Sequence, residues 1–175
     1  MKPTVIGIAG PSGGGKSTVA KILEERLDCR VFHSDAYFKG ELPEITSPDD
    51  GNTYPDWNHP SSVRYDDLIT DIKAELSRDE HRYIIVEGLL IFYIDALREL
   101  MDFKIFVTAS PETCLYRRIV RNMSLFGQTP EYIGGYYLKC ARHREAEFCR
   151  PTQKYADFII DNDVSYEEDL KKLSF

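Results

Sequence analysis

The sequence predicts an α/β fold in which helices cover both faces of one parallel β-sheet. Four short segments are apolar almost throughout, which is typical of strands buried on both faces: VIGIA, YIIVE, KIFV and DFIID. Segments with the length of helices separate these strands along the chain, and such alternation is typical of a parallel sheet. A chain of 175 residues suits one compact domain, so we expect residues 1–175 to form a single unit.

The expected elements alternate between strand and helix over most of the chain. Four of the five expected strands are the apolar runs. The helix after residue 110 opens with Pro111 in its first turn, and Ser165 and Glu168 have capping-box spacing for the last helix. In chain order the expected elements are strand 4–9, helix 16–27, strand 30–34, helix 64–77, strand 82–87, strand 103–107, helix 111–124, helix 130–148, strand 156–161 and a short helix from 166.

The segment 35–63 follows neither periodicity and carries four prolines. It is longer than connections within compact domains usually are. Loops of this kind commonly cover a substrate, so we expect a substrate-binding loop here.

The composition argues against two classes of partner. The chain has 22 Lys and Arg against 29 Asp and Glu, whereas proteins that bind nucleic acid generally carry surplus positive charge. Its longest apolar stretch, residues 83–94, is interrupted by Glu87 and is shorter than the roughly 20 residues that cross a bilayer. The first residues lack the pattern of a secretory signal. We therefore expect a cytoplasmic protein that binds neither nucleic acid nor membrane.

Residues 10–17 read GPSGGGKS, which fits the pattern G-x-x-x-x-G-K-[ST] and stands between a strand and a helix, as that pattern requires. Glycines let successive backbone N–H groups face inward, and the following helix adds the partial positive charge of its N-terminus. Lys16 can reach the β and γ phosphates, and the Ser17 hydroxyl can ligate the Mg²⁺ that bridges them. The expected ligand is a nucleoside triphosphate, bound by Gly10, Ser12, Gly13, Gly14, Gly15, Lys16, Ser17 and Thr18.

Two acidic residues favour phosphoryl transfer to an acceptor. Asp35 follows the second strand at the carboxyl edge of the sheet, where it can orient and deprotonate an attacking hydroxyl or, alternatively, cap a turn. Glu87 interrupts an apolar run at the same edge, where a metal, water or substrate hydroxyl would compensate its burial; the alternative is a structural acid that is merely hydrogen-bonded. A guanine-reading N/T-K-x-D stretch is missing from the corresponding late segment FIIDNDVS, which argues against a GTPase switch.

These and further segments resemble the uridine kinase and phosphoribulokinase group of P-loop kinases, which includes nicotinamide riboside kinases. The resemblance rests on GPSGGGKST, HSDAYFK, DWNHPSS, IIVEGLLIF, DFKIFVTASPETCLYRRIVRN and PTQKYADFIIDN, which follow one another in the family's order. It implies a three-layer P-loop sandwich with a five-stranded parallel sheet ordered 2-3-1-4-5. It also implies ATP with Mg²⁺ as cofactors and transfer of the γ-phosphoryl group to a primary hydroxyl, commonly the 5′-hydroxyl of a ribonucleoside.

The resemblance also assigns the acceptor side. By position, Asp35 matches the family's catalytic base, and Glu87 matches an acid that lies near the metal and the ribose. Tyr37 and Phe38 match aromatic residues of the substrate loop, with ordinary packing as the alternative.

The family tends to hold ribose hydroxyls with an aspartate before a His-Pro pair. This chain has Asn58 at that position, flanked by Asp56 and followed by Asp66. An asparagine both donates and accepts hydrogen bonds, so we expect sugar binding to survive the change.

On the phosphate side, Arg118 and Arg121 match arginines of a helix that leads into a lid at about 122–130. Their i, i+3 spacing puts them on one face of that helix, from which they can stabilise the transferring phosphoryl group, with a solvated basic face as the alternative. In the expected reaction Asp35 activates the hydroxyl, Lys16 neutralises phosphate charge, and Arg118 with Arg121 closes over the phosphates.

Two departures concern substrate recognition. Uridine kinases usually carry Arg-Gly-Arg in the lid, where this chain has Phe126-Gly127-Gln128. They also place a base-reading hairpin between the second helix and the third strand, whereas only about residues 78–82 lie there in this chain, as in the compact nicotinamide riboside kinases. Three tyrosines on the helix after the lid can stack on a base or pack in the core: Tyr132, Tyr136 and Tyr137.

The sequence as a whole predicts an ATP-dependent kinase of uridine kinase type, whose small-molecule acceptor is uridine or cytidine. The alternatives are a nicotinamide riboside kinase and a kinase of another small alcohol such as a sugar phosphate. A different class of protein, a nucleotide-binding regulator or an ATPase without a small acceptor, is the further alternative.

Overall fold

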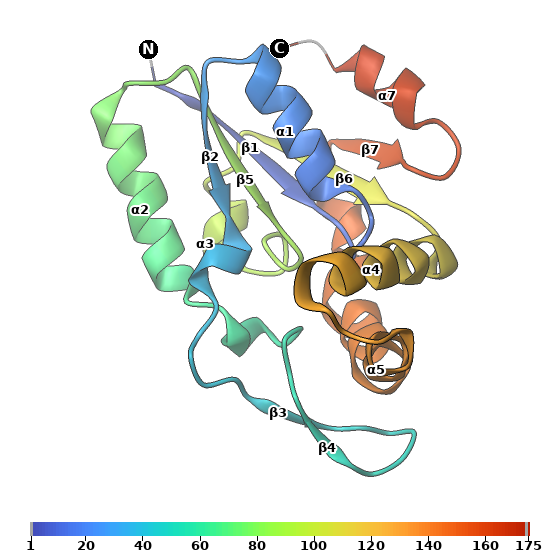
Figure 1. Cartoon of the computed structure of the whole chain (residues 1–175). Coiled ribbons are helices and arrows are strands. Elements are labelled where there is room, and N and C mark those ends of the chain that lie inside the picture. Colours follow the sequence, from blue (N-terminus) through green and yellow to red (C-terminus); the bar gives the residue numbers. More distant parts are fainter. Residues whose placement is uncertain (1, 174) are drawn as a thin grey trace.

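The computed structural model describes residues 2–173 and residue 175, and its centre is a five-stranded parallel sheet (Figure 1). The strands are β1 (Thr4–Ala9), β2 (Cys29–His33), β5 (Tyr83–Gly88), β6 (Phe103–Thr108) and β7 (Phe158–Asp161). They lie in the order β2-β5-β1-β6-β7, so β1 is the central strand. The expected α/β architecture with a parallel sheet is therefore confirmed.

The expected strand order was 2-3-1-4-5, whereas the observed order is 2-5-1-6-7. The numbers differ because two short strands that the sequence did not predict come between β2 and β5 in the chain. β3 (Glu44–Thr46) and β4 (Thr53–Pro55) pair antiparallel within the long connection between β2 and α2 (Tyr65–Arg78), and they stand apart from the main sheet. Strands of three residues are too short to show a period of two in the sequence, which is why this ribbon was expected to be loop.

Helices cover both faces of the sheet because alternate residues of each strand point to opposite sides. On one face α1 (Lys16–Arg26) and α7 (Tyr166–Lys172) pack on a buried cluster that includes Ile6, Ile8, Val19, Leu23 and Leu170. On the other face α2 and α3 (Asp95–Arg98) pack on a cluster that includes Val5, Leu68, Ile72, Leu97 and Phe148. The edge strand β7 departs from the expected burial on both faces, since its Ile159 is 42% exposed.

The helices near the carboxyl edge of the sheet start and end at recognisable signals. The Ser110 hydroxyl caps α4 (Pro111–Phe126) by accepting a 3.2 Å hydrogen bond from the backbone N–H of Thr113, and Pro111 lies in the first turn as predicted. Gly127 ends this helix with φ of 63°. At α7 the predicted capping box does not form, because the Ser165 hydroxyl donates to Asp169.

One long helical segment replaces the single α-helix expected over 130–148. It consists of α5 (Pro130–Tyr136), a π-helical stretch η3 (Tyr137–Ala141), α6 (Arg142–Arg144) and a second π-helical stretch η4 (Glu145–Cys149). A 3₁₀ stretch, η5 (Arg150–Tyr155), leads from it to β7. Of two further 3₁₀ turns, η1 (Ser34–Tyr37) directly follows β2, and η2 (Pro60–Ser62) lies just before α2. In the described part of the chain, every helix is too short or too polar to cross a bilayer.

Candidate active site

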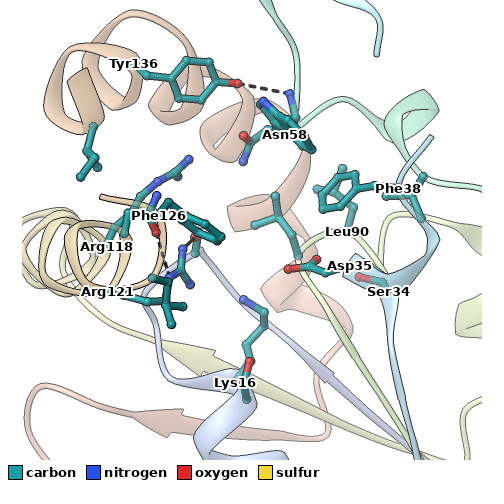
Figure 2. A pocket seen from close by; sticks show the side chains of 18 of the residues that line it. Lys16, Ser34, Asp35, Phe38, Asn58, Leu90, Arg118, Arg121, Phe126 and Tyr136 are labelled. Carbon is teal, nitrogen blue, oxygen red and sulfur yellow. Dashed lines mark hydrogen bonds between the residues drawn. The ribbon is translucent and has the colours of Figure 1, made fainter. Parts of the chain in front are cut away.

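A cavity of about 660 Å³ opens at the carboxyl edge of the sheet. Its walls come from the glycine-rich loop and α1, from the ends of β2 and β5, from the connection before α2, and from α4 with α5. Figure 2 shows the side chains of Lys16, Asp35, Arg118 and Arg121 around this space. Residues far apart in the sequence thus meet at the edge where open α/β sheets bind ligands.

The glycine-rich loop has a backbone that only glycine adopts without strain. Gly10, Gly13 and Gly15 have φ values of 148°, 83° and 108°, respectively. At Gly13 a Cβ atom would lie 2.4 Å from the carbonyl oxygen of Cys114, so the space is closed as well. Lys16 donates from Nζ to the carbonyl oxygen of Pro11 at 3.1 Å, and Figure 2 shows its amine reaching the cavity.

Glu87 forms the centre of a polar cluster beside this loop. It is 5% exposed at the end of β5, and its Oε1 accepts a 3.2 Å hydrogen bond from the Ser17 hydroxyl. The Nδ1 atom of His33 lies 2.8 Å from the same oxygen. A hydroxyl and a carboxylate are the oxygen donors that Mg²⁺ prefers, so Ser17 and Glu87 fit that ion.

Asp35 and Phe38, two of the residues expected to bind substrate, both line the cavity. Asp35 is exposed in the turn η1 after β2, and Figure 2 shows its carboxylate directed toward the space that Lys16 also faces. Asn58 lines the same cavity and is 4% exposed. Its Oδ1 atom has no hydrogen-bond partner among the described residues, which leaves a buried acceptor available to a ligand.

Two arginines enter the cavity from α4. Arg118 is 9% exposed, and its Nε and Nη1 atoms lack hydrogen-bond partners within the described chain. Arg121 reaches the Ser12 hydroxyl with Nη2 at 3.5 Å. Desolvation, followed by the like charge of Arg118, lowers the pKa of the Arg121 guanidinium. Two guanidinium groups beside the glycine-rich loop thus give this end of the cavity positive charge, of the kind that pairs with phosphate.

Three residues predicted to bind substrate lie outside the cavity. Tyr37 turns to α2 and donates its hydroxyl to Asp71 at 2.7 Å. Asp56 is fully buried and accepts a 2.7 Å hydrogen bond from Nε of Arg144. Asp66 is exposed in the first turn of α2 and is not part of the cavity wall. Tyr37 and Asp56 are held by residues 34 and 88 positions away in the chain, which proximity to a motif does not reveal.

Trp57 and several other residues to which the sequence assigned no role also line the cavity. Trp57, adjacent to Asn58, packs edge-on against Phe38 with ring centroids 5.1 Å apart. Of the three tyrosines after the lid, Tyr132 and Tyr136 line the cavity, whereas Tyr137 is 4% exposed within the core. Further lining residues are Ser34, His59, Val63, Tyr65, Leu89, Leu90, Asn122, Leu125, Phe126, Gln128 and Ile133. For Phe126 and Gln128 the sequence offered one signal, namely that Phe-Gly-Gln stands where the lids of uridine kinases usually carry Arg-Gly-Arg.

The site combines a glycine-rich loop that follows the central strand β1, the buried Glu87 beside it, and two arginines that line the cavity from α4. This combination is typical of a P-loop phosphotransferase. The profile of the Phosphoribulokinase / Uridine kinase family matches residues 53–166, a range that begins after the glycine-rich loop. This chain belongs to that family, and it is accordingly an ATP-dependent phosphotransferase with an alcohol group as acceptor.

Individual relatives agree with this assignment. The uridine kinase of Clostridium novyi (strain NT) is 33% identical over 186 residues, covering 91% of this chain and 88% of that protein. The uridine kinase of Chlamydia pneumoniae is 32% identical over 185 residues, covering 91% of this chain and 82% of that protein.

Solved structures share the fold at lower identity. TT1252 from Thermus thermophilus superposes with a TM-score of 0.61 at 21% identity, covering 98% of this chain and 94% of that one. A putative fructose transport system kinase from Silicibacter sp. TM1040 gives a TM-score of 0.58 at 18% identity, covering 90% and 89%.

Proposed function

We propose that this enzyme transfers the γ-phosphoryl group of ATP to the 5′-hydroxyl of a ribonucleoside, with uridine or cytidine as acceptor. The observation that carries the proposal is that Lys16 and Asp35 face the same space from different walls of one cavity (Figure 2). Phosphoryl transfer requires cations on the phosphates and a group that orients the attacking hydroxyl. The uridine kinases among the relatives support a nucleoside as acceptor.

The nucleotide half of the cavity is the glycine-rich loop with the start of α1. Its backbone N–H groups and the N-terminus of α1 bind the phosphates, and Lys16 exchanges its bond to the Pro11 carbonyl for the β and γ oxygens. The proposed nucleotide-binding residues are Gly10, Ser12, Gly13, Gly14, Gly15, Lys16, Ser17 and Thr18. Ser17 and Glu87 would hold Mg²⁺, which supplies charge neutralisation on the phosphates when bound.

The proposed catalytic step uses Asp35 as general base. Its carboxylate accepts the proton of the acceptor hydroxyl while the oxygen attacks the γ-phosphorus in line. Arg118 and Arg121 stabilise the charge on the transferring group, since both line the cavity and Arg118 has buried N–H donors without a partner in the described chain. A lid at 122–130 closes over the site and excludes water, which would otherwise compete with the acceptor.

The acceptor half of the cavity favours an acceptor without a phosphate of its own. All Lys and Arg residues in the cavity wall belong to the glycine-rich loop or α4: Lys16, Arg118 and Arg121. The opposite part of the wall presents Phe38, Trp57 and Asn58, which suit a ring and a sugar rather than an anion. A sugar phosphate would therefore bury its phosphate away from the lysine and arginines of the cavity wall, at a large desolvation cost.

Nicotinamide riboside is the second candidate acceptor, and one observation favours it. The connection between α2 and β5 has only residues 79–82, which leaves no room for the base-reading hairpin expected of uridine kinases. This chain has its hairpin, β3 with β4, at a different place, between β2 and α2.

An acceptor panel tests the proposal. The purified protein is incubated with ATP and Mg²⁺ and with uridine, cytidine, nicotinamide riboside or ribose 5-phosphate, and mass spectrometry detects addition of one phosphoryl group. We expect addition to uridine and cytidine, whereas addition to nicotinamide riboside alone would establish the second candidate. ATP consumption that none of these compounds stimulates would contradict the nucleoside kinase and favour the ATPase or regulator.

A further inference from the structure

Two neighbouring residues on the long helical segment contact opposite halves of the cavity region. Arg144 ends α6, and Glu145 begins the π-helical stretch η4. Consecutive residues on a helix point about 100° apart, so a single helix can direct two neighbours at different partners. The residues preceding and following them are helical as well, which makes this segment a stiff connection.

Glu145 makes the contact on the nucleotide side. It is fully buried, and its Oε1 accepts a 3.3 Å hydrogen bond from the backbone N–H of Ser12 in the glycine-rich loop. The same oxygen lies 4.0 Å from Nη1 of Arg118, while Oε2 has no partner among the described residues. Glu145 thus connects the glycine-rich loop with the arginine that we place on the phosphoryl group.

The charge around Glu145 makes this contact responsive to a nucleotide. Burial raises the pKa of its carboxyl group, and three cations oppose that shift: Arg118, Arg150 and Lys16. A triphosphate in the loop would attract Lys16 and Arg118 away from Glu145, because both cations also face the cavity. Nucleotide binding therefore changes the balance of forces on Glu145.

Arg144 makes the contact on the acceptor side. Its Nε donates a 2.7 Å hydrogen bond to Oδ2 of the fully buried Asp56, 88 residues away in the chain. Oδ1 of Asp56 in turn accepts a hydrogen bond from the backbone N–H of Asn58 at 3.0 Å. Tyr136, earlier on the same helical segment, accepts a 3.2 Å hydrogen bond from the backbone N–H of Trp57. The loop that carries Trp57 and Asn58 into the cavity is thus held by this helix.

We propose that Arg144 and Glu145 are positioning residues that link the two halves of the site, so that nucleotide binding at the glycine-rich loop orders the acceptor loop around Asp56, Trp57 and Asn58. The proposal rests on the proposed function in taking the glycine-rich loop as the nucleotide site and Trp57 and Asn58 as acceptor-binding residues. The link is mechanical: neither residue touches the reacting atoms, and each acts through the segment that it holds.

Hydrogen–deuterium exchange with a non-hydrolysable ATP analogue and Mg²⁺ tests the link without any acceptor. In the wild type, the analogue should slow exchange in residues 10–17 by direct binding and in residues 53–60 through the link, by about 5-fold or more in the second segment. Glu145→Gln keeps size and hydrogen bonding but removes the charge, so it should reduce the protection of 53–60 while 10–17 stays protected.

Two further variants separate the link from general damage. Asp56→Asn breaks the other end, so it should bind the analogue normally at 10–17 and still lose the protection of 53–60, which decides the matter if Glu145→Gln fails to fold. Glu131→Gln makes the same chemical change at an exposed position on α5 and should retain both effects.

Either of two results would overturn the link: a wild type in which 53–60 exchanges at the same rate with and without the analogue, or variants at Glu145 and Asp56 that keep the full protection. Such a result beside normal nucleoside turnover would leave the proposed function standing. Intact protection without turnover of any nucleoside would instead overturn the proposed function alone.

Discussion

The Ser17 hydroxyl lies 3.2 Å from Oε1 of Glu87, although 70 residues separate the two in the chain. Sheet register produces this contact, because β1 pairs with β5 so that Ile8 stands opposite Glu87, and the loop after β1 delivers Ser17 to the same edge. The neighbouring strand β2 brings His33 opposite Glu87 in the same way. Parallel pairing therefore brings Ser17 and Glu87, the two proposed metal ligands, together at one edge of the sheet although they lie far apart in the chain.

Replacement of the proposed base tests its role directly. Asp35→Asn should lower kcat by at least about 100-fold, because the amide cannot accept the proton of the acceptor hydroxyl. Binding of ATP should stay unchanged, since the exposed Asp35 makes no contact with the glycine-rich loop that the structure records. Steady-state kinetics and calorimetric ATP binding measure the two effects. Asp66→Asn is the matched control, and equal losses in both variants would remove Asp35 from the proposed role.

The sheet and the glycine-rich loop were predictable because each depends on a local pattern. The apolar runs gave four strands of the sheet, and GPSGGGKS gave a loop whose position between β1 and α1 the structure confirms. The walls of the cavity were less predictable. Within DWN, Asp56 turns inward to Arg144 while Asn58 reaches the cavity, and a partner 88 residues away decides between them.

The side chains of the lid were equally hard to place from the local sequence. The sequence indicated that Phe126 replaces an arginine of the resembling kinases, but it did not indicate that the ring would line the cavity. That placement follows from the position of α4 beside the cavity, where Phe126 shares a helix face with Arg118 and Asn122. Tyr136 and Tyr137 are adjacent on one helical segment, yet only Tyr136 lines the cavity, because the two side chains point in different directions.

Arg118 should contribute mainly to the chemical step. Its buried donors lack partners, so they are available to charge that develops on the transferring phosphoryl group. Arg118→Gln should lower kcat by roughly 100-fold to 1,000-fold with a smaller change in ATP affinity, as for loss of one preorganised donor. Arg142→Gln, which removes an arginine paired with Asp49 outside the cavity, is the control and should keep kcat. A rise in the KM for ATP with unchanged kcat would assign Arg118 to nucleotide binding instead.

Phe126 should determine affinity for the acceptor. It is 66% exposed although it is apolar and lines the cavity, and Figure 2 shows its ring directed inward. Burying a phenylalanine side chain contributes about 1.5–3 kcal/mol, so contact with a base would be lost in Phe126→Ala. We expect the KM of the nucleoside to rise by about 10-fold to 100-fold while kcat falls less. Met123→Ala, at a half-exposed position of the same helix outside the cavity wall, should leave both constants unchanged.

Two glycines of the chain should respond oppositely to alanine. Gly13 has φ of 83°, and its Cβ would lie 2.4 Å from the Cys114 carbonyl oxygen, so Gly13→Ala must distort the phosphate-binding loop. Backbone strain of this kind costs about 1–3 kcal/mol, and we expect ATP affinity to fall by about 10-fold to 100-fold in titration calorimetry. Unchanged ATP affinity in Gly13→Ala would contradict the assignment of this loop to the phosphates.

Gly134 lies within α5 with open space where a Cβ atom would stand. Gly134→Ala should therefore raise the melting temperature by up to about 3 °C, because alanine favours the helix and restricts the unfolded chain.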